Sequence, residues 1–304
     1  MEAQEYYSNG KLLLTGEYAI LDGASGLALP TKYGQYLTVK NDSSEIISWK
    51  SIDDQDNVWF EAEFTLENLK TVRTSNTEIS NMLGKILMEA RILNPSFLSG
   101  SNGFTVQSKL TFPRNWGLGS SSTLIANISK WADNLNPYRL LAATFGGSGY
   151  DIACANHNTP ISYRSNKYTP LVNQVDFNPN FTNNLYFVYL NQKKNSREAI
   201  AAYRKLTIDK NGLVSKIDEI TQAILNCNQL SEFERLLTEH EQLLSKTLNL
   251  PMVKESLFPD YPNAIKSLGA WGGDFIIATG TATDMNYFQK KGYSTILSYS
   301  EMIL

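Results

Sequence analysis

The sequence predicts a fold with both β-strands and α-helices, because segments with strand character and segments with helical periodicity both occur along it. The chain has 304 residues, which suits one large domain or two modest ones. Hydrophobic residues make up 42% and charged residues 19%, which is an ordinary globular composition with a sizeable core. This composition leaves no room for a long disordered tail.

Strand character in the first half comes from the partial alternation of apolar and polar residues. The expected strands are Lys11–Leu14, Tyr36–Val39, Glu45–Trp49, Val58–Phe64 and Phe104–Leu110. A sheet is therefore expected in this half of the chain.

Two helices are expected between and after these strands. Apolar residues recur at three- and four-residue intervals over Thr77–Leu93, and Asn76 is a suitable N-cap. The same spacing recurs over Ser120–Ala132, which directly follows the loop 115–119. This second helix therefore begins where the loop ends.

The second half begins with an apolar strand, Leu185–Leu190, followed by the polar segment Asn191–Arg197. A new domain is expected to start near this point. Val214–Leu248 predicts two helices, and Ser231 with Glu234 matches a capping box before the second apolar stripe.

Charge and cysteine content exclude several classes of protein. The net charge of −3 provides no field that would attract nucleic acid. Cys154 and Cys227 are the two cysteines, so no disulfide framework is expected and a cytoplasmic location is the simpler expectation. No apolar stretch of about 20 residues predicts a membrane span.

Glycine and serine residues gather in Phe112–Ile125, FPRNWGLGSSSTLI, where a loop turns into a helix. A helix N-terminus offers backbone N–H groups and a positive dipole end to an anion, and glycines let the backbone approach phosphate oxygens. The spacing fits neither a Walker A loop nor a dinucleotide fingerprint. The segment therefore indicates either an anion site or an ordinary turn and cap.

A carboxylate follows a glycine-containing turn in Phe145–Ala155, FGGSGYDIACA. Asp151 is a candidate general base there, because glycines bring a backbone close to a ligand. The alternative is an acid favoured by the dipole in the first turn of a helix.

Two further segments are uninformative when taken alone. Lys11 precedes an apolar run that ends near Glu17, and a lone lysine there is most often a solvated charge. Ile265–Leu268 leads into the glycine-rich Gly269–Phe275, which alone is typical of a bulge or a hairpin turn before the strand Phe275–Ala278.

Taken together and in this order, four segments resemble the motifs of the GHMP kinase superfamily, which includes galactokinase and the homoserine, mevalonate and phosphomevalonate kinases. They are GKLLLTGEY at Gly10–Tyr18, GLGSSS at Gly117–Ser122, SGYD at Ser148–Asp151 and GAWGG at Gly269–Gly273. The resemblance extends from residue 8 to about residue 278. It is greatest to the mevalonate-pathway branch, and GGSGYDIACA resembles a bacterial subgroup with a GYDIA signature.

The resemblance implies a two-domain fold. Residues 1–180 would form an N-terminal α+β domain with a left-handed βαβ unit, and residues 181–304 would form a ferredoxin-like α+β domain. It implies ATP and Mg²⁺ as cofactors and a small-molecule substrate that meets ATP between the domains. Neither nucleic acid nor a membrane is expected as a partner, and the protein is expected to be a monomer or a homodimer.

The resemblance also assigns roles to individual residues. Asp151 would accept or orient the proton of the acceptor, with Lys11 beside it to hold its charge. Ser121 would bind Mg²⁺. The cofactor-binding residues would be Asn115, Gly117, Leu118, Gly119, Ser120, Ser121 and Ser122. The substrate-binding residues would be Glu17, Tyr18, Ser148, Gly149, Tyr150, Gly272 and Gly273.

Departures from the family pattern bear on the substrate. Leu140 stands where mevalonate kinases carry a Mg²⁺-binding Glu, and Tyr18 stands where they usually carry His. Together with the Tyr in SGYD, these features favour phosphomevalonate over mevalonate. Trp271 and Asp274 occupy positions that are commonly small in the third motif.

A phosphorylated acceptor needs cationic side chains as partners. The alternative is that these side chains are solvated charges on loops. The candidates are Lys11, Arg114, Lys193, Lys194 and Arg197.

Two alternative functions stay open, namely a diphosphomevalonate decarboxylase and a catalytically silent relative that binds a nucleotide or metabolite.

Overall fold

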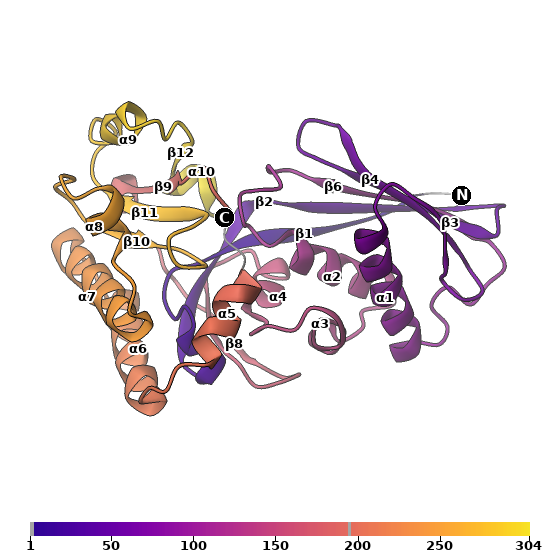
Figure 1. The fold of residues 1–304 in the computed structure, drawn as a ribbon, viewed down its shortest axis with the longest axis horizontal. Coiled ribbons are helices and arrows are strands. Elements are labelled where there is room, and N and C mark those ends of the chain that lie inside the picture. The colour runs from indigo at the N-terminus through magenta and orange to yellow at the C-terminus, as the bar shows by residue number, and fades with distance from the viewer. Residues whose placement is uncertain (1–2, 194–195) are drawn as a thin grey trace.

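The structure is a computed structural model that describes residues 3–193 and 196–304, and it contains two β-sheets (Figure 1). The large sheet has eight strands in the order β5-β4-β3-β6-β2-β7-β8, with β1 paired to β2. Its strands are β1 (Gln4–Leu13), β2 (Ser25–Asp42), β3 (Ile46–Ile52), β4 (Val58–Thr65), β5 (Thr71–Thr74), β6 (Gly103–Leu110), β7 (Ile161–Arg164) and β8 (Leu171–Gln174).

Four helices accompany the large sheet, and α1, α2 and α3 lie on one side of it in Figure 1. They are α1 (Thr77–Leu93), α2 (Ser120–Trp131), α3 (Pro137–Thr144) and α4 (Tyr150–Ala155). Strand β3 runs parallel to β6, and the connection between them contains β4, β5 and α1, so this crossover includes the helix of the expected βαβ unit. The left hand of this crossover stays a prediction.

The small sheet has the order β10-β11-β9-β12, in which all neighbours are antiparallel. Its strands are β9 (Leu185–Tyr189), β10 (Ile265–Ser267), β11 (Phe275–Thr279) and β12 (Ile296–Ser298). Its helices are α5 (Ser196–Arg204), α6 (Lys210–Leu225), α7 (Leu230–Leu248), α8 (Val253–Leu257), α9 (Asn286–Lys290) and α10 (Tyr299–Met302). Helices lie between the first and second strands and between the third and fourth, which confirms the ferredoxin-like expectation.

Local signals predicted the helices α1, α2, α6 and α7, and the remaining short helices were not predicted. Asn76 accepts a hydrogen bond from the Ile79 N–H at the start of α1, as its capping role requires, and α2 begins at Ser120 as expected. The capping box at Ser231 and Glu234 is wrong. Helix α7 begins earlier, after Gln229, without a side-chain cap, and the Glu234 carboxylate accepts a hydrogen bond from Thr279 instead.

The first strand is longer than predicted, because residues 4–9 also pair with β2. Lys11 consequently lies near the end of β1, where the chain approaches the loop before α2, and not at the start of a strand. The domain boundary expected between residues 180 and 181 falls in the connection from β8 to β9 and stays a prediction.

One hydrophobic cluster contains residues of both sheets and of the helices α6 and α7. Its members include Leu12, Leu29, Phe187, Ile220, Phe233 and Phe275. The two sheets therefore share a continuous apolar core. No helix in the described ranges has both the length and the apolar character that crossing a membrane requires.

We expect Phe187→Ala to lower the free energy of unfolding by about 3–5 kcal/mol, because Phe187 is fully buried in this shared core. Tryptophan fluorescence and far-UV circular dichroism should report one common transition in urea. Val72→Ala is the control, since Val72 is 59% exposed and its truncation should change stability by no more than about 0.5 kcal/mol. A loss below about 1 kcal/mol for Phe187→Ala would contradict the shared core.

Candidate functional site

A cavity of about 490 Å³ lies where the end of β1, the N-termini of α2 and α4, helix α5 and the loop 269–274 meet. Twelve of the residues predicted for the site line it: Lys11, Glu17, Tyr18, Gly117, Leu118, Gly119, Ser120, Ser121, Ser122, Ser148, Tyr150 and Asp151. Residues from three separate motifs thus come together in one place.

The loop before α2 has the backbone of an anion site. Gly117 and Gly119 have φ values of +68° and +89°, a conformation that L side chains rarely adopt. Gly119 is the N-cap of α2 and supplies no side chain to the free N–H groups of the first turn. The positive end of α2 therefore faces the cavity without a side-chain cap.

The serines at the start of α2 differ in their surroundings. Ser121 is exposed and lines the cavity, so its hydroxyl is accessible to a ligand. Ser122 is buried, and its hydroxyl donates a 3.2 Å hydrogen bond to Oδ2 of Asp151. Ser122 thereby connects the loop of the second motif to the carboxylate of the SGYD turn.

Asp151 is the second residue of α4, and its carboxylate has one engaged and one open oxygen. Oδ1 is buried and has no hydrogen-bond partner among the described residues. The preceding Gly149 has a φ of +88°, and a Cβ there would lie 2.9 Å from the Tyr163 hydroxyl, so the turn requires glycine. A buried acceptor without a partner is costly, which makes Oδ1 a candidate contact for a ligand.

Lys11 lies on the same cavity but forms no ion pair with Asp151 within 4 Å. Its ammonium donates a 3.0 Å hydrogen bond to the Gly117 carbonyl and lies 5.5 Å from the centre of the Tyr150 ring. Burial, followed by the charge of Asp151, raises the pKa of Tyr150 well above its usual value. The phenol therefore stays protonated at neutral pH.

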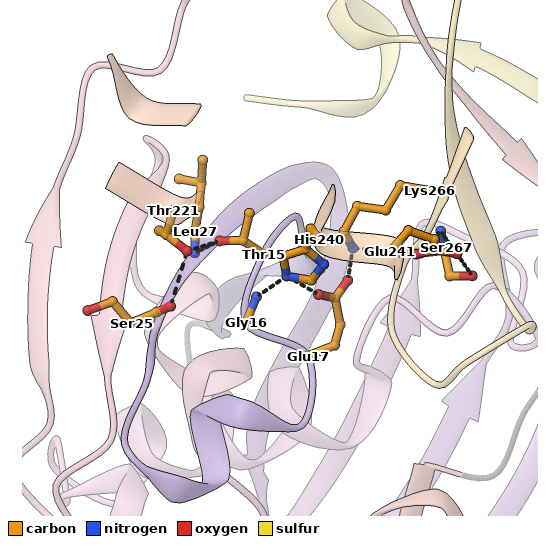
Figure 2. A network of polar contacts seen from close by, with 10 residues as sticks. All are labelled: Thr15, Gly16, Glu17, Ser25, Leu27, Thr221, His240, Glu241, Lys266 and Ser267. Atoms are coloured by element: carbon orange, nitrogen blue, oxygen red, sulfur yellow. Dashed lines mark hydrogen bonds and ion pairs between the residues drawn. The ribbon is translucent and has the colours of Figure 1, made fainter. Parts of the chain in front are cut away.

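Glu17 is part of a buried polar network shown in Figure 2. Its Oε1 accepts a hydrogen bond from Nζ of Lys266 in β10, and both side chains are buried. His240 of α7 accepts a 3.1 Å hydrogen bond from the Gly16 N–H through Nε2, and burial holds its pKa well below the usual value. Glu17 lines the cavity, but this network joins the first motif to the small sheet and α7.

The carboxyl groups of this network are desolvated. Burial raises the pKa of Glu17 to about 7, although the charge of Lys266 lowers it. Burial also raises the pKa of Glu241, which accepts hydrogen bonds from the N–H and hydroxyl of Ser267. Lys266 is therefore the cation that compensates two buried carboxyl groups.

Tyr18 connects the first motif to the glycine-rich loop of the second half. Its backbone has a φ of +63°, and its hydroxyl accepts a 3.0 Å hydrogen bond from the Trp271 N–H. Its ring packs against Tyr203, with the ring centres 5.3 Å apart. The backbone around Trp271 is therefore anchored on Tyr18.

Four predicted site residues do not line the cavity. They are Asn115, Gly149, Gly272 and Gly273. The Asn115 carbonyl accepts a hydrogen bond from the Tyr189 hydroxyl, and the Gly272 carbonyl accepts one from the Gln192 side chain. Gly149 lies within the turn before α4. From the glycine-rich loop, Gly269, Ala270 and Asp274 line it instead. The loop turns at Gly269 and Gly272, which both have positive φ, and this places its two ends at the cavity.

Helix α5 also contributes to the lining, through Ser196, Arg197, Ala199, Ile200, Ala201 and Arg204. Of these, the sequence identified only Arg197 as a candidate. The cavity is lined by more basic than acidic side chains. The basic ones are Lys11, Arg114, Lys193, Arg197 and Arg204, and the acidic ones are Glu17, Asp151 and Asp274. This excess of positive charge favours an anionic ligand. The candidate Lys194 lies outside the described residues.

We expect Lys266→Met to lower the free energy of unfolding by about 3–5 kcal/mol at pH 8, because it leaves two buried carboxyl groups without their cation. A carboxyl group with a raised folded-state pKa contributes its full stability below the ordinary value of 4.5 and loses it as the pH rises to about 7. Without Lys266 these pKa values rise further. The deficit should therefore be smaller at pH 5 than at pH 8, as measured by urea unfolding.

Lys109→Met is the matched control, since Lys109 pairs with Asp56 at the surface and should contribute about 1 kcal/mol or less. A deficit for Lys266→Met that is equal at both pH values would contradict the role given to Lys266.

The fold is shared with solved kinase structures of low sequence identity. A Methanococcus jannaschii mevalonate kinase aligns with a TM-score of 0.72 and 17% identity over 97% of each chain. A Streptococcus pneumoniae phosphomevalonate kinase, solved with phosphomevalonate and AMPPNP, aligns with a TM-score of 0.70 and 17% identity over 98% of this chain and 100% of that one.

A Lactococcus lactis galactokinase solved with galactose aligns with a TM-score of 0.66 and 15% identity over 98% of this chain and 93% of that one. No protein-family model matches the sequence, and no curated protein matches it significantly. At these identities the likeness concerns the fold, which extends over nearly the whole length of each structure. The chain therefore has the two-domain α+β fold of the GHMP kinases, as its four motifs predicted.

Proposed function

We propose that this protein is an ATP- and Mg²⁺-dependent kinase that phosphorylates a small mevalonate-like acid, with phosphomevalonate as the preferred acceptor. The observation that carries the proposal is the buried, unpartnered Oδ1 of Asp151 in a cavity that also receives the N-terminus of α2. One end of the site suits an anion, and the other offers a proton acceptor. Phosphoryl transfer requires this combination.

The loop 117–122 would hold the phosphates of ATP through backbone N–H groups, as helix N-termini do. Mg²⁺ fits the donor set, because the exposed hydroxyl of Ser121 and the phosphate oxygens are hard oxygen ligands. The cation would neutralise phosphate charge during transfer. Among the described residues no group of three His, Cys, Asp or Glu side chains could hold a metal alone, so most of its ligands would come from the nucleotide and water.

The proposed reaction transfers the γ-phosphoryl group of ATP to the acceptor. An oxygen of the acceptor forms a bond to the γ-phosphorus, the bond to the β,γ-bridging oxygen breaks, and ADP leaves with that electron pair. When the attacking oxygen carries a proton, as in a hydroxyl or a monoanionic phosphate, that proton passes to Oδ1 of Asp151, while Ser122 holds Oδ2. Lys11, on the Gly117 carbonyl, places a positive charge beside the phosphate loop.

The preference for a phosphorylated acceptor is supported by the cations around the cavity. Arg197 and Arg204 come from α5, and Lys193 and Arg114 come from loops on the same cavity. Lys193 donates a hydrogen bond to the Arg114 carbonyl, which keeps these two loops together. A second phosphate needs such partners in addition to those used by ATP.

We expect Asp151→Asn to lower turnover by about 10²–10⁴-fold, because the amide keeps the shape of the carboxylate but cannot accept the proton. The dissociation constant of the Mg²⁺ complex of the ATP analogue AMPPNP should change by less than about threefold, since Asp151 is proposed to act on the acceptor. Steady-state kinetics and calorimetric titration measure the two quantities. Asp176→Asn, an exposed acid outside the cavity, is the matched control. Parent-level turnover by Asp151→Asn would remove the central residue of the proposal.

We expect phosphomevalonate to be a better substrate than mevalonate, homoserine or galactose in an ATP-consumption assay. Arg197→Ala should raise KM for phosphomevalonate about tenfold or more through the loss of a charged phosphate contact, with little change in KM for ATP. Arg73→Ala, at an exposed position in β5, is the control. Turnover of mevalonate alone would favour a mevalonate kinase, release of carbon dioxide would favour the decarboxylase, and no ATP consumption with any acceptor would favour a silent relative.

A further inference from the structure

The carbonyl groups at the end of the loop before α2 are held by Lys11. Its Nζ donates a 3.0 Å hydrogen bond to the Gly117 carbonyl, and its backbone N–H donates a 3.1 Å hydrogen bond to the Leu118 carbonyl. A Cβ on Gly117 would overlap the carboxylate of Asp274, so the loop also has a close neighbour from the second half of the chain. This end of the loop is therefore held by β1 and packed against the glycine-rich loop 269–274.

The beginning of the same loop is held from the small sheet. The Tyr189 hydroxyl, at the end of β9, donates a 3.1 Å hydrogen bond to the Asn115 carbonyl. Nζ of Lys193 donates a 3.0 Å hydrogen bond to the neighbouring Arg114 carbonyl. Tyr189 is 4% exposed and does not line the cavity, whereas Lys193 does. Tyr189 is therefore placed to act on the loop but not on a ligand in the cavity.

The ring that carries the Tyr189 hydroxyl is fixed in the core that the two sheets share. Its centre lies 5.3 Å from that of Phe275, the residue opposite it on β11. Trp116, the residue after Asn115, packs edge-on against Phe275 and against Tyr33 of β2, with ring centres 5.5 and 5.3 Å apart. The hydroxyl and the carbonyl that it holds are thus attached to the same aromatic cluster.

These contacts matter because the loop has two glycines at positive φ, and glycine allows a peptide group to rotate more easily than other residues do. A phosphate at the N-terminus of α2 needs backbone N–H groups directed at it, whereas a rotated peptide group presents a carbonyl oxygen, which repels the phosphate. A donor on each carbonyl opposes such rotation. Loss of one donor lowers the fraction of molecules that are ready to bind, and the apparent affinity falls by the same factor.

We propose that Tyr189 is a positioning residue for the nucleotide, which keeps the loop 115–119 in its phosphate-binding conformation through the Asn115 carbonyl. The inference rests on the proposed function, because it assumes that this loop and the start of α2 bind the phosphates of ATP. It makes nucleotide affinity depend on a strand of the small sheet that does not line the phosphate end of the cavity. The four sequence motifs do not include Tyr189, which lies in an apolar run.

The test compares two variants that each lose one tyrosine hydroxyl. Tyr189→Phe keeps the packed ring and removes the donor to the loop. Tyr299→Phe is the matched control, because the Tyr299 hydroxyl donates a buried 3.1 Å hydrogen bond to the Phe177 carbonyl within the same hydrophobic cluster. Neither Tyr299 nor Phe177 lines the cavity. Thermal melting shows that both variants are folded.

Calorimetric titration with the Mg²⁺ complex of AMPPNP measures the affinity. For Tyr189→Phe we expect the dissociation constant to rise about fivefold, which corresponds to the loss of one hydrogen bond. For Tyr299→Phe it should stay within about twofold of the wild-type value. Hydrogen–deuterium exchange of the ligand-free protein provides a second readout. The amide groups of residues 114–119 should exchange at least about threefold faster in Tyr189→Phe than in Tyr299→Phe, because a general loss of stability would affect both variants alike.

The inference is overturned if folded Tyr189→Phe binds the complex as tightly as the wild type, or if Tyr299→Phe weakens binding equally, since stability alone would then explain the effect. It is also overturned if the loop exchanges alike in the two variants. In each of these cases binding of the complex by the wild type leaves the proposed function standing. If the wild type does not bind the complex, the proposed function fails and the inference fails with it.

Discussion

The buried ion pair between Glu17 and Lys266 is the interaction on which the arrangement of the site depends (Figure 2). It connects the loop after β1 to β10, two segments that lie far apart in the sequence. Around it, His240 binds the backbone of that same loop and Glu241 binds the backbone of β10. A buried ion pair contributes little net stability, but it penalises every arrangement in which one partner is left alone. The network therefore fixes the position of the first motif against the small sheet more than it adds stability.

The fixed position matters because the cavity is built from both halves of the chain. The loop before α2 and the SGYD turn come from the first half, whereas α5 and the glycine-rich loop come from the second. Tyr18 adds a second connection, through the Trp271 N–H, directly beside Glu17 in the sequence. The Thr15 hydroxyl adds a third by its 2.8 Å contact with Thr221 of α6. Three neighbouring residues of one loop thus align the two halves that ATP and acceptor would have to bridge.

Sequence signals predicted what local chemistry determines. The Asn76 cap, the helix after the serine loop and the two helices α6 and α7 follow from spacing within one turn or a few turns. Strand β2 was recognised only in part, because a strand buried on both faces lacks the alternation that marks a half-exposed one. The partners of Glu17 and the place of Asp274 against Gly117 arise from contacts across the fold, so no window of sequence contains them. The residues of α5 other than Arg197 were missed for the same reason, since they line the cavity only where the helix meets it.

The apolar core shared by the two sheets limits how this molecule can move. A wide hinge rotation of one half against the other would expose Phe187, Phe233 and Phe275 to water together, and each ring adds to the cost. Entry and release of ligands would then rely on smaller displacements of segments that border the cavity, such as α5 and the loop 269–274. For the proposed kinase, such local gating would make the rate of product release a property of these two segments.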